Sequence, residues 1–227
     1  WFTIGAFNQG CLVRCDTNAD STRANFAMDM GNATILQGGV WSDDITVNPT
    51  TLGIFNNTNF ACLVHDGTDL KMYINGLEEA SDPVGTLVTP SAAIFGVLSP
   101  GLGQTYYGEL RTHQAGIFSS ALSATAIKEL YRAGPIANFK DISSIAGTDY
   151  TQVMADSLEV YWAMGNHDTL TVSTADTAST VYDRSGNGHN GTTSGTMSAP
   201  SSETKLLIHS NTDIDGDTSI ADSSPSA

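Results

Sequence analysis

The stretch 61–76 constrains the fold more than any other part of the chain. An apolar run at 61–65 leads into Asp66-Gly67, and a second run at 70–74 leads into Asn75-Gly76. Asp-Gly and Asn-Gly supply the positive φ angles that tight hairpin turns require, and β-rich segments flank both dipeptides. The stretch therefore predicts an antiparallel meander.

The second strand of this meander alternates in polarity. Leu70, Met72 and Ile74 fall on one face, while Lys71 and Tyr73 fall on the other. This period of two is typical of a strand with one side toward a core. We expect the sheet to be one layer of a sandwich or barrel.

Other short apolar segments extend the pattern along the chain. Gly, Pro, Ser and Asn separate them, as expected of turns between strands. Strands are expected at 10–13, 25–30, 93–97, 109–118 and 158–164. The sequence therefore predicts an all-β fold with Gly-rich turns.

One short helix interrupts the strands at about 124–132. Ser123 is a good N-cap, and Leu122 can pack on Ile127 as a hydrophobic staple. Gly134-Pro135 then stop the helix. A helix of this length is not stable alone in water, so we expect it to dock on the sandwich.

The charge composition of the chain limits the kinds of partner that it can bind. The 227 residues include 24 Asp and Glu but only 9 Lys and Arg, giving a net charge of −15. The basic residues are scattered, which excludes a general nucleic-acid binder and disfavours an anionic membrane surface. No apolar stretch approaches the ~20 residues that span a bilayer, so no membrane insertion is expected. The chain opens on Trp1 and reads as part of a longer or processed polypeptide.

Two motifs resemble a known family. The first is ACLVHDG at 61–67 with LKMYING at 70–76, and the second is GELR at 108–111 with IFSSALS at 117–123 and the helix that follows. Together they resemble the laminin-G-like, concanavalin-A-like jelly-roll family over about the first 135 residues. The resemblance implies an antiparallel jelly-roll β-sandwich and does not by itself imply an activity.

A third motif resembles the opening of such a module but follows the closing one. It consists of LEVYW at 158–162 and VYDRSGNGHNGT at 181–192, with Asp183 and Gly186 in its turn. Either a second module begins here, or this segment completes the first by circular permutation. The favoured division is a module at 1–137, a linker at 138–156, and the start of further modules at 157–227.

A further opening motif supports tandem modules. TKLLIH at 204–209 with TSIADSS at 218–224 resembles openings in phage and environmental virion-associated jelly-roll proteins. The resemblance implies a β-sandwich array of the kind found on virion surfaces, tail fibres and secreted adhesins. Expected partners are neighbouring modules or copies of the chain.

A calcium site is considered at the acidic end of the chain. Oxygen ligands at alternate positions suit a hard cation, and they occur at Asn211, Asp213, Asp215, Asp217 and Asp222, with Gly216 at the turn. An EF-hand, however, ends on Glu and has flanking helices, which are not expected here. The alternative is an acidic turn between two strands.

Aromatic residues are candidates for a carbohydrate platform, because their rings stack on the apolar faces of sugars. The candidates are Trp41, Tyr73, Tyr106, Tyr107 and Trp162. Core packing or contact between modules is the alternative role for them. The Gly-rich turn at 183–188 has a similar pair of interpretations, an anion cradle or a structural turn.

Few features of the sequence support the hypothesis that the chain is an enzyme. His65-Asp66 and His113 lack a nucleophile elbow nearby, so no Ser-His-Asp triad is predicted. Glu78-Glu79 and Asp82 follow a hairpin turn and point to opposite faces, unlike a paired glycosidase cleft. No catalytic residue is therefore assigned.

The sequence favours a non-enzymatic structural or adhesion module with a lectin-like surface, on a virion or outside a cell. The alternative is a carbohydrate-binding module of a secreted polysaccharide-degrading enzyme, with Ca²⁺ as a candidate cofactor. Both hypotheses make a glycan a candidate ligand.

Overall fold

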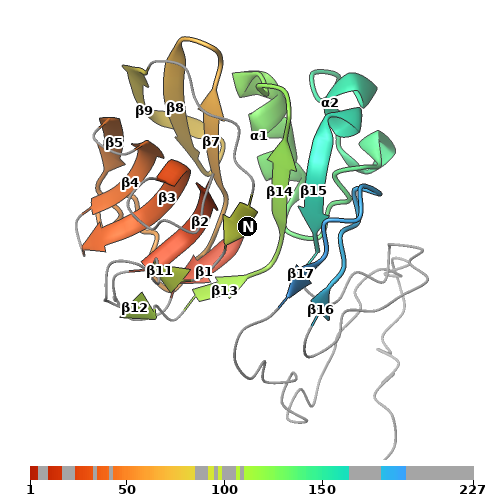
Figure 1. Ribbon diagram of the computed structural model, residues 1–227. Helices are drawn as coiled ribbons and strands as arrows, with labels where there is room; N and C mark the ends of the chain where they lie inside the picture. The colour runs from red at the N-terminus through yellow and green to blue at the C-terminus, as the bar shows by residue number, and fades with distance from the viewer. Residues whose placement is uncertain are drawn as a thin grey trace, which may run out of the picture.

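The computed structural model (Figure 1) is an all-β protein with antiparallel sheets and few helices. It describes residues 1–4, 10–16, 24–32, 35–40, 43–84, 92–94, 97–98, 106–107, 110–163 and 180–192. The strands are β1 (Phe2–Ile4), β2 (Gly10–Asp16), β3 (Ala24–Asn32), β4 (Ile35–Val40), β5 (Asp43–Val47), β6 (Thr58–Asn59), β7 (Ala61–His65), β8 (Asp69–Ile74), β9 (Leu77–Pro83), β10 (Ala92–Ile94), β11 (Val97–Leu98), β12 (Tyr106–Tyr107), β13 (Leu110–Thr112), β14 (Ala115–Phe118), β15 (Leu158–Trp162), β16 (Thr180–Val181) and β17 (Gly191–Thr192). The helices are α1 (Ala124–Ala133), the 3-10 turn η2 (Ile142–Ser144) and α2 (Gln152–Asp156).

Two sheets pack face to face around a first core. One has the strand order β10-β2-β3-β4-β5, and the other has the order β7-β8-β9. The core combines Met28, Leu36 and Ile45 of the first sheet with Leu70, Met72 and Ile74 of β8. Gly38 of β4 allows the sheets to approach closely, because a Cβ there would lie 2.7 Å from Cε of Met72. This packing confirms the predicted all-β sandwich.

The predicted meander at 61–76 is confirmed. Strand β8 pairs antiparallel with β7 and β9. Gly67 has φ 101° in the first turn, and Asn75 and Gly76 have φ 51° and 78° in the second. Asn75 fixes that turn further, since its Oδ1 accepts a hydrogen bond from the N–H of Phe60 at 2.9 Å.

The opposite face of the meander contributes to a second core. Tyr73 and Val64 lie there, 4% and 7% exposed, in one buried cluster with Ile127 and Leu130 of α1. The alternation of β8 therefore separates two cores rather than a core from solvent. On this face Cys62 and Lys71 are half-exposed, and Glu78 and Ser81 of β9 are exposed.

Helix α1 begins and ends as predicted. The Ser123 hydroxyl accepts a hydrogen bond from the N–H of Ala126 at 3.1 Å. Leu122 and Ile127 lie in the same buried cluster, in agreement with a hydrophobic staple. Gly134 follows the helix with φ 84°.

The predicted strand at 109–118 is two strands. β13 pairs with β1, and β14 pairs with β15. The chain changes partner at Gln114, whose side chain is 1% exposed and donates hydrogen bonds from Nε2 to the Ala137 carbonyl and to Oη of Tyr161. An inward-turned amide with long-range partners is invisible to local sequence patterns.

The segment that resembles a module opening packs against the one that resembles a module closing. β15 runs antiparallel to β14, as Figure 1 shows beside α1. Leu158 and Tyr161 of β15 are 1% and 0% exposed and belong to the second core. In this structure the two segments share one hydrophobic cluster.

The residues between these segments also contribute to the second core. Phe139, Ile145, Tyr150 and Ala155 are all buried in it. Tyr150 donates a hydrogen bond to the Phe139 carbonyl at 2.6 Å. The stretch also contains α2, which was not predicted from the sequence; it has only 5 residues, and Thr151 at its N-cap position makes no side-chain capping bond.

Glu129 joins this stretch to α1. Glu129 is 7% exposed, and its carboxylate accepts hydrogen bonds from the N–H groups of Thr148, Asp149 and Tyr150, at 2.9, 3.0 and 2.7 Å. Gly147 has φ 138°, and a Cβ there would lie 1.8 Å from Oε1 of Glu129. The loop is thus shaped around the carboxylate. The N–H of Tyr150, together with those of Asp149 and Thr148, holds the pKa of Glu129 below its usual value.

We expect Glu129→Gln to lower the melting temperature at neutral pH, because an amide nitrogen cannot accept the loop N–H bonds. Since the folded-state pKa is lowered, the stabilisation is present above pH 4.5 and is lost as the pH falls through the folded pKa. Thermal melts across that pH range check this. Glu159 is exposed, so Glu159→Gln should change neither the melting temperature at neutral pH nor its dependence on pH. An equal effect of the two variants would contradict the role given to Glu129.

Gly76 and Gly67 provide a matched pair for the turns. Both have positive φ, but a Cβ at Gly76 would lie 2.9 Å from the Tyr131 ring, whereas a Cβ at Gly67 would meet nothing within 4 Å. We expect Gly76→Ala to destabilise by about 2–4 kcal/mol, from backbone strain plus overpacking. Gly67→Ala should cost only about 1–2 kcal/mol. Urea unfolding measures both, and equal losses would show that Tyr131 does not contribute.

Candidate functional site

The aromatic candidates fall into two groups. Tyr73 is 4% exposed and donates its phenolic proton to Oε2 of Glu78 at 2.9 Å. Burial, assisted by Glu78, raises its pKa to about 12. Trp162 is 8% exposed, and its Nε1 donates to the His189 carbonyl at 2.9 Å. Both side chains are buried, in agreement with the core-packing role considered as the alternative.

The other aromatic candidates are described less fully. Tyr106 and Tyr107 form β12, which pairs with β11, and only their backbone is described. Trp41 lies outside the described residues, between β4 and β5 in the sequence. Their role as a carbohydrate platform stays a prediction.

The candidate calcium ligands, at 211–222, also lie outside the described residues. Within the part of the chain that is described, no three His, Cys, Asp or Glu side chains gather closely enough to hold a metal ion. The calcium site therefore stays a prediction too.

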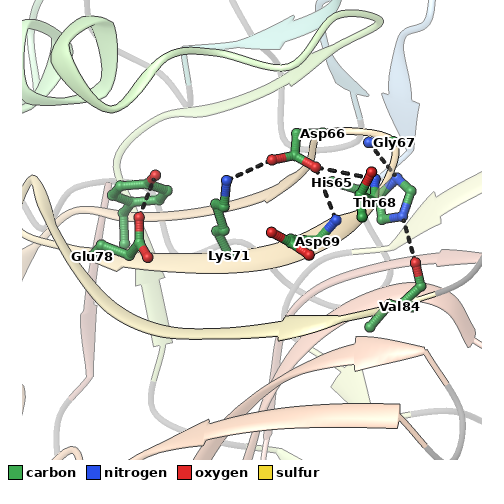
Figure 2. Close-up of polar contacts among 9 residues, drawn as sticks. His65, Asp66, Gly67, Thr68, Asp69, Lys71, Glu78 and Val84 are labelled. Carbon is green, nitrogen blue, oxygen red and sulfur yellow. Dashed lines mark hydrogen bonds and ion pairs between the residues drawn. The ribbon is translucent and has the colours of Figure 1, made fainter.

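A polar cluster occupies the turn between β7 and β8 (Figure 2). Asp66 Oδ1 accepts hydrogen bonds from the N–H groups of Asp69 and Thr68, at 2.9 and 3.1 Å, and Oδ2 lies 2.5 Å from Nζ of Lys71. The Asp69 N–H, then Lys71 and the Thr68 N–H, lower the pKa of Asp66, and Asp66 in turn raises that of Lys71. A partly exposed ion pair of this kind contributes little to stability. The main role of the Asp66 carboxylate is therefore to hold the conformation of the turn.

The two histidines of the catalytic alternative are engaged in backbone and side-chain contacts. His65 Nδ1 accepts from the Gly67 N–H at 3.3 Å, which leaves Nε2 as the donor to the Val84 carbonyl, also at 3.3 Å (Figure 2). His113 Nε2 lies 2.8 Å from Oγ1 of Thr3. These contacts position strands and turns.

Asp183 organises the Gly-rich loop that follows β16. Its carboxylate accepts hydrogen bonds from the N–H groups of Tyr161, Ser185 and His189, each at 2.9 Å. Partial burial would raise the pKa of Asp183, but these three donors outweigh it, so the pKa lies below its usual range. One of these bonds, from the Tyr161 N–H, attaches the loop to β15.

Further bonds hold the same loop. The Arg184 N–H donates to the Tyr161 carbonyl at 2.6 Å, and the Ser185 hydroxyl donates to the Glu159 carbonyl at 2.8 Å. Lys140 Nζ donates to the Ser185 carbonyl at 2.6 Å. Gly186 has φ 97°, which a turn residue without a side chain adopts at little cost. Of the two interpretations of this turn, the structural one accounts for all these bonds.

The outer part of the loop is exposed to solvent. Asn187, His189 and Asn190 all lie there. Sequence patterns alone could not distinguish these residues from any other polar turn, because their orientation depends on bonds to β15 and to Asp183. Their side chains are accessible from solvent.

The fold defines the chain as an all-β sandwich protein with antiparallel sheets. No helix among the described residues combines the length and apolar character needed to cross a membrane. No family model matches the chain, and no curated protein matches it either.

Solved structures do match. One is the crystal structure of a protein from Bacteroides ovatus ATCC 8483, provisionally described as carbohydrate binding, with a TM-score of 0.52 and 14% sequence identity. The match covers 86% of this chain and 52% of the other, so the chain spans about half the length of that protein. The likeness at this identity is one of fold.

Asp183→Asn tests the loop anchor. An amide keeps one acceptor oxygen but loses the charge and the second acceptor, so we expect a loss of about 1–3 kcal/mol in unfolding free energy. Asp141→Asn is the control, because the Asp141 carboxylate accepts its bonds from one residue, Ser143, in an exposed turn. Denaturant unfolding should separate the two variants, and a loss no larger than the control's would remove Asp183 from its anchoring role.

Proposed function

We propose that this chain is a non-enzymatic carbohydrate-binding module of a larger, multi-module polypeptide exposed on a virion or cell surface. The observation that carries the proposal is the fold match to the Bacteroides ovatus protein, which is itself provisionally described as carbohydrate binding. The laminin-G-like, jelly-roll resemblance of the sequence supports the same class of fold.

The module boundary forms part of the proposal. β15 pairs with β14, and residues from 137 to 163 share the second core with α1. The Asp183 loop then attaches to β15. These contacts favour a module that extends to about residue 192 and is completed by its permuted opening segment. Later residues, including the opening motif at 204–224, would start the next module.

The described acids and histidines support a binding role over catalysis. Glu129 and Asp183 accept backbone N–H bonds, Asp66 forms a turn, and His65 contacts the backbone. None of these groups is paired across an open cleft in the described part of the chain. Neighbouring modules or copies of the chain are the proposed partners, beside a glycan.

Glycan binding by the full chain tests the proposal. We expect retention on at least one neutral polysaccharide among dextran, xylan, mannan and galactan in affinity electrophoresis, with dissociation constants of about 1 mM to 1 μM for a single module. Trp41→Ala, Tyr106→Ala and Tyr107→Ala, made singly, test the aromatic platform. Repeating the assay with a chelator tests the predicted calcium site. No retention on any of the four, with or without Ca²⁺, would contradict the proposed function.

A further inference from the structure

Two exposed asparagines of the Asp183 loop are each held by one half of the side-chain amide. Asn187 Nδ2 donates hydrogen bonds to the Glu159 and Leu158 carbonyls, at 3.0 and 3.3 Å. Asn190 Oδ1 accepts from the Asp183 N–H at 3.0 Å. Each amide is thus fixed in orientation by β15 or by the loop itself.

The other half of each amide is left to solvent. Among the described residues, no bond uses Oδ1 of Asn187, Nδ2 of Asn190 or the imidazole of His189. An amide oxygen accepts, an amide nitrogen donates, and a neutral imidazole does one of each. We call these three side chains the polar shelf.

The backbone beneath the polar shelf is fixed at its centre. The His189 N–H donates to Oδ2 of Asp183, and the His189 carbonyl accepts from Nε1 of Trp162, both at 2.9 Å. Because the loop backbone and the two amides are already held, a ligand that meets them loses less entropy than one that must order a free loop.

Open space borders the same groups. A Cβ at Gly186 or Gly188 would meet nothing within 4 Å. Asn187, His189 and Asn190 are themselves exposed. A ligand can therefore approach the loop backbone closely from the solvent side.

We propose that the polar shelf binds a neutral glycan through neighbouring hydroxyl groups. A sugar hydroxyl both donates and accepts, and it finds an acceptor at Asn187, donors at Asn190 and either at His189. The net charge of −15 disfavours acidic glycans. This inference rests on the proposed function and assigns its contact residues, in addition to the predicted aromatic platform.

Two variants of the full chain remove shelf groups. His189→Ala keeps both backbone bonds of residue 189. Asn190→Ala removes the amide donors together with the acceptor for the Asp183 N–H, so it loses one anchoring bond, as the control variant does. Asn57→Ala is the matched control, because Asn57 is also exposed and anchored through Nδ2, to the Gly53 carbonyl at 2.9 Å, on a different loop.

Affinity electrophoresis against dextran, xylan, mannan and galactan gives the readout, with melting temperatures measured in parallel. We expect each shelf variant to bind about tenfold more weakly or worse, as loss of one or two hydrogen bonds implies, while its melting temperature falls no further than that of Asn57→Ala. Asn57→Ala should bind as the parent does. The His189 imidazole resonances should also shift on titration with the retained glycan.

Two results would overturn the inference, and they differ in scope. If the parent chain binds one of these glycans and both shelf variants bind within about twofold of it, the shelf is not the contact site and the proposed function stands. If the parent chain binds none of these glycans, both the shelf as a binding site and the proposed function are contradicted.

Discussion

Strand β8 is the element on which the rest of the structure depends, because each of its faces contributes to a buried core. Leu70, Met72 and Ile74 pack against the five-stranded sheet, while Tyr73 packs toward α1. Because β8 contributes to both cores, its position determines how far apart they lie. The turns that bound it must therefore hold its register, which explains the side-chain bond from Asn75 to the Phe60 backbone at one end and the Asp66 turn at the other.

The second core is closed by polar groups that act over long distances in sequence. Glu129 gathers three N–H groups of the 148–150 loop, and Gln114 ties β14 to Tyr161. Asp183 then attaches the Gly-rich loop to β15. Each of these buried or half-buried groups would destabilise the fold if unpaired, so their pairing specifies one arrangement of the late segments.

Local patterns predicted much of the fold and little of the candidate site. The hairpin dipeptides and the helix caps act through neighbouring residues, so the meander at 61–76 and the limits of α1 could be predicted. The break in the expected strand at Gln114 could not, because its causes lie at Ala137 and Tyr161. The aromatic and calcium candidates at Trp41 and 211–222 lie outside the described residues, and the polar shelf depends on which half of each asparagine amide is already bonded.

The engagement of Asp183 bears on how any cation dependence of this protein is to be understood. Three backbone N–H groups already occupy the carboxylate oxygens, and the Ser185 hydroxyl lies 2.8 Å from one of them. An ionised carboxylate accepts at about four positions, and at least three of them are occupied here, which leaves little for a hard cation that needs about six to eight oxygen ligands. A change in stability on chelation would accordingly be a signal from another part of the chain, and the folded state of this loop should be indifferent to Ca²⁺.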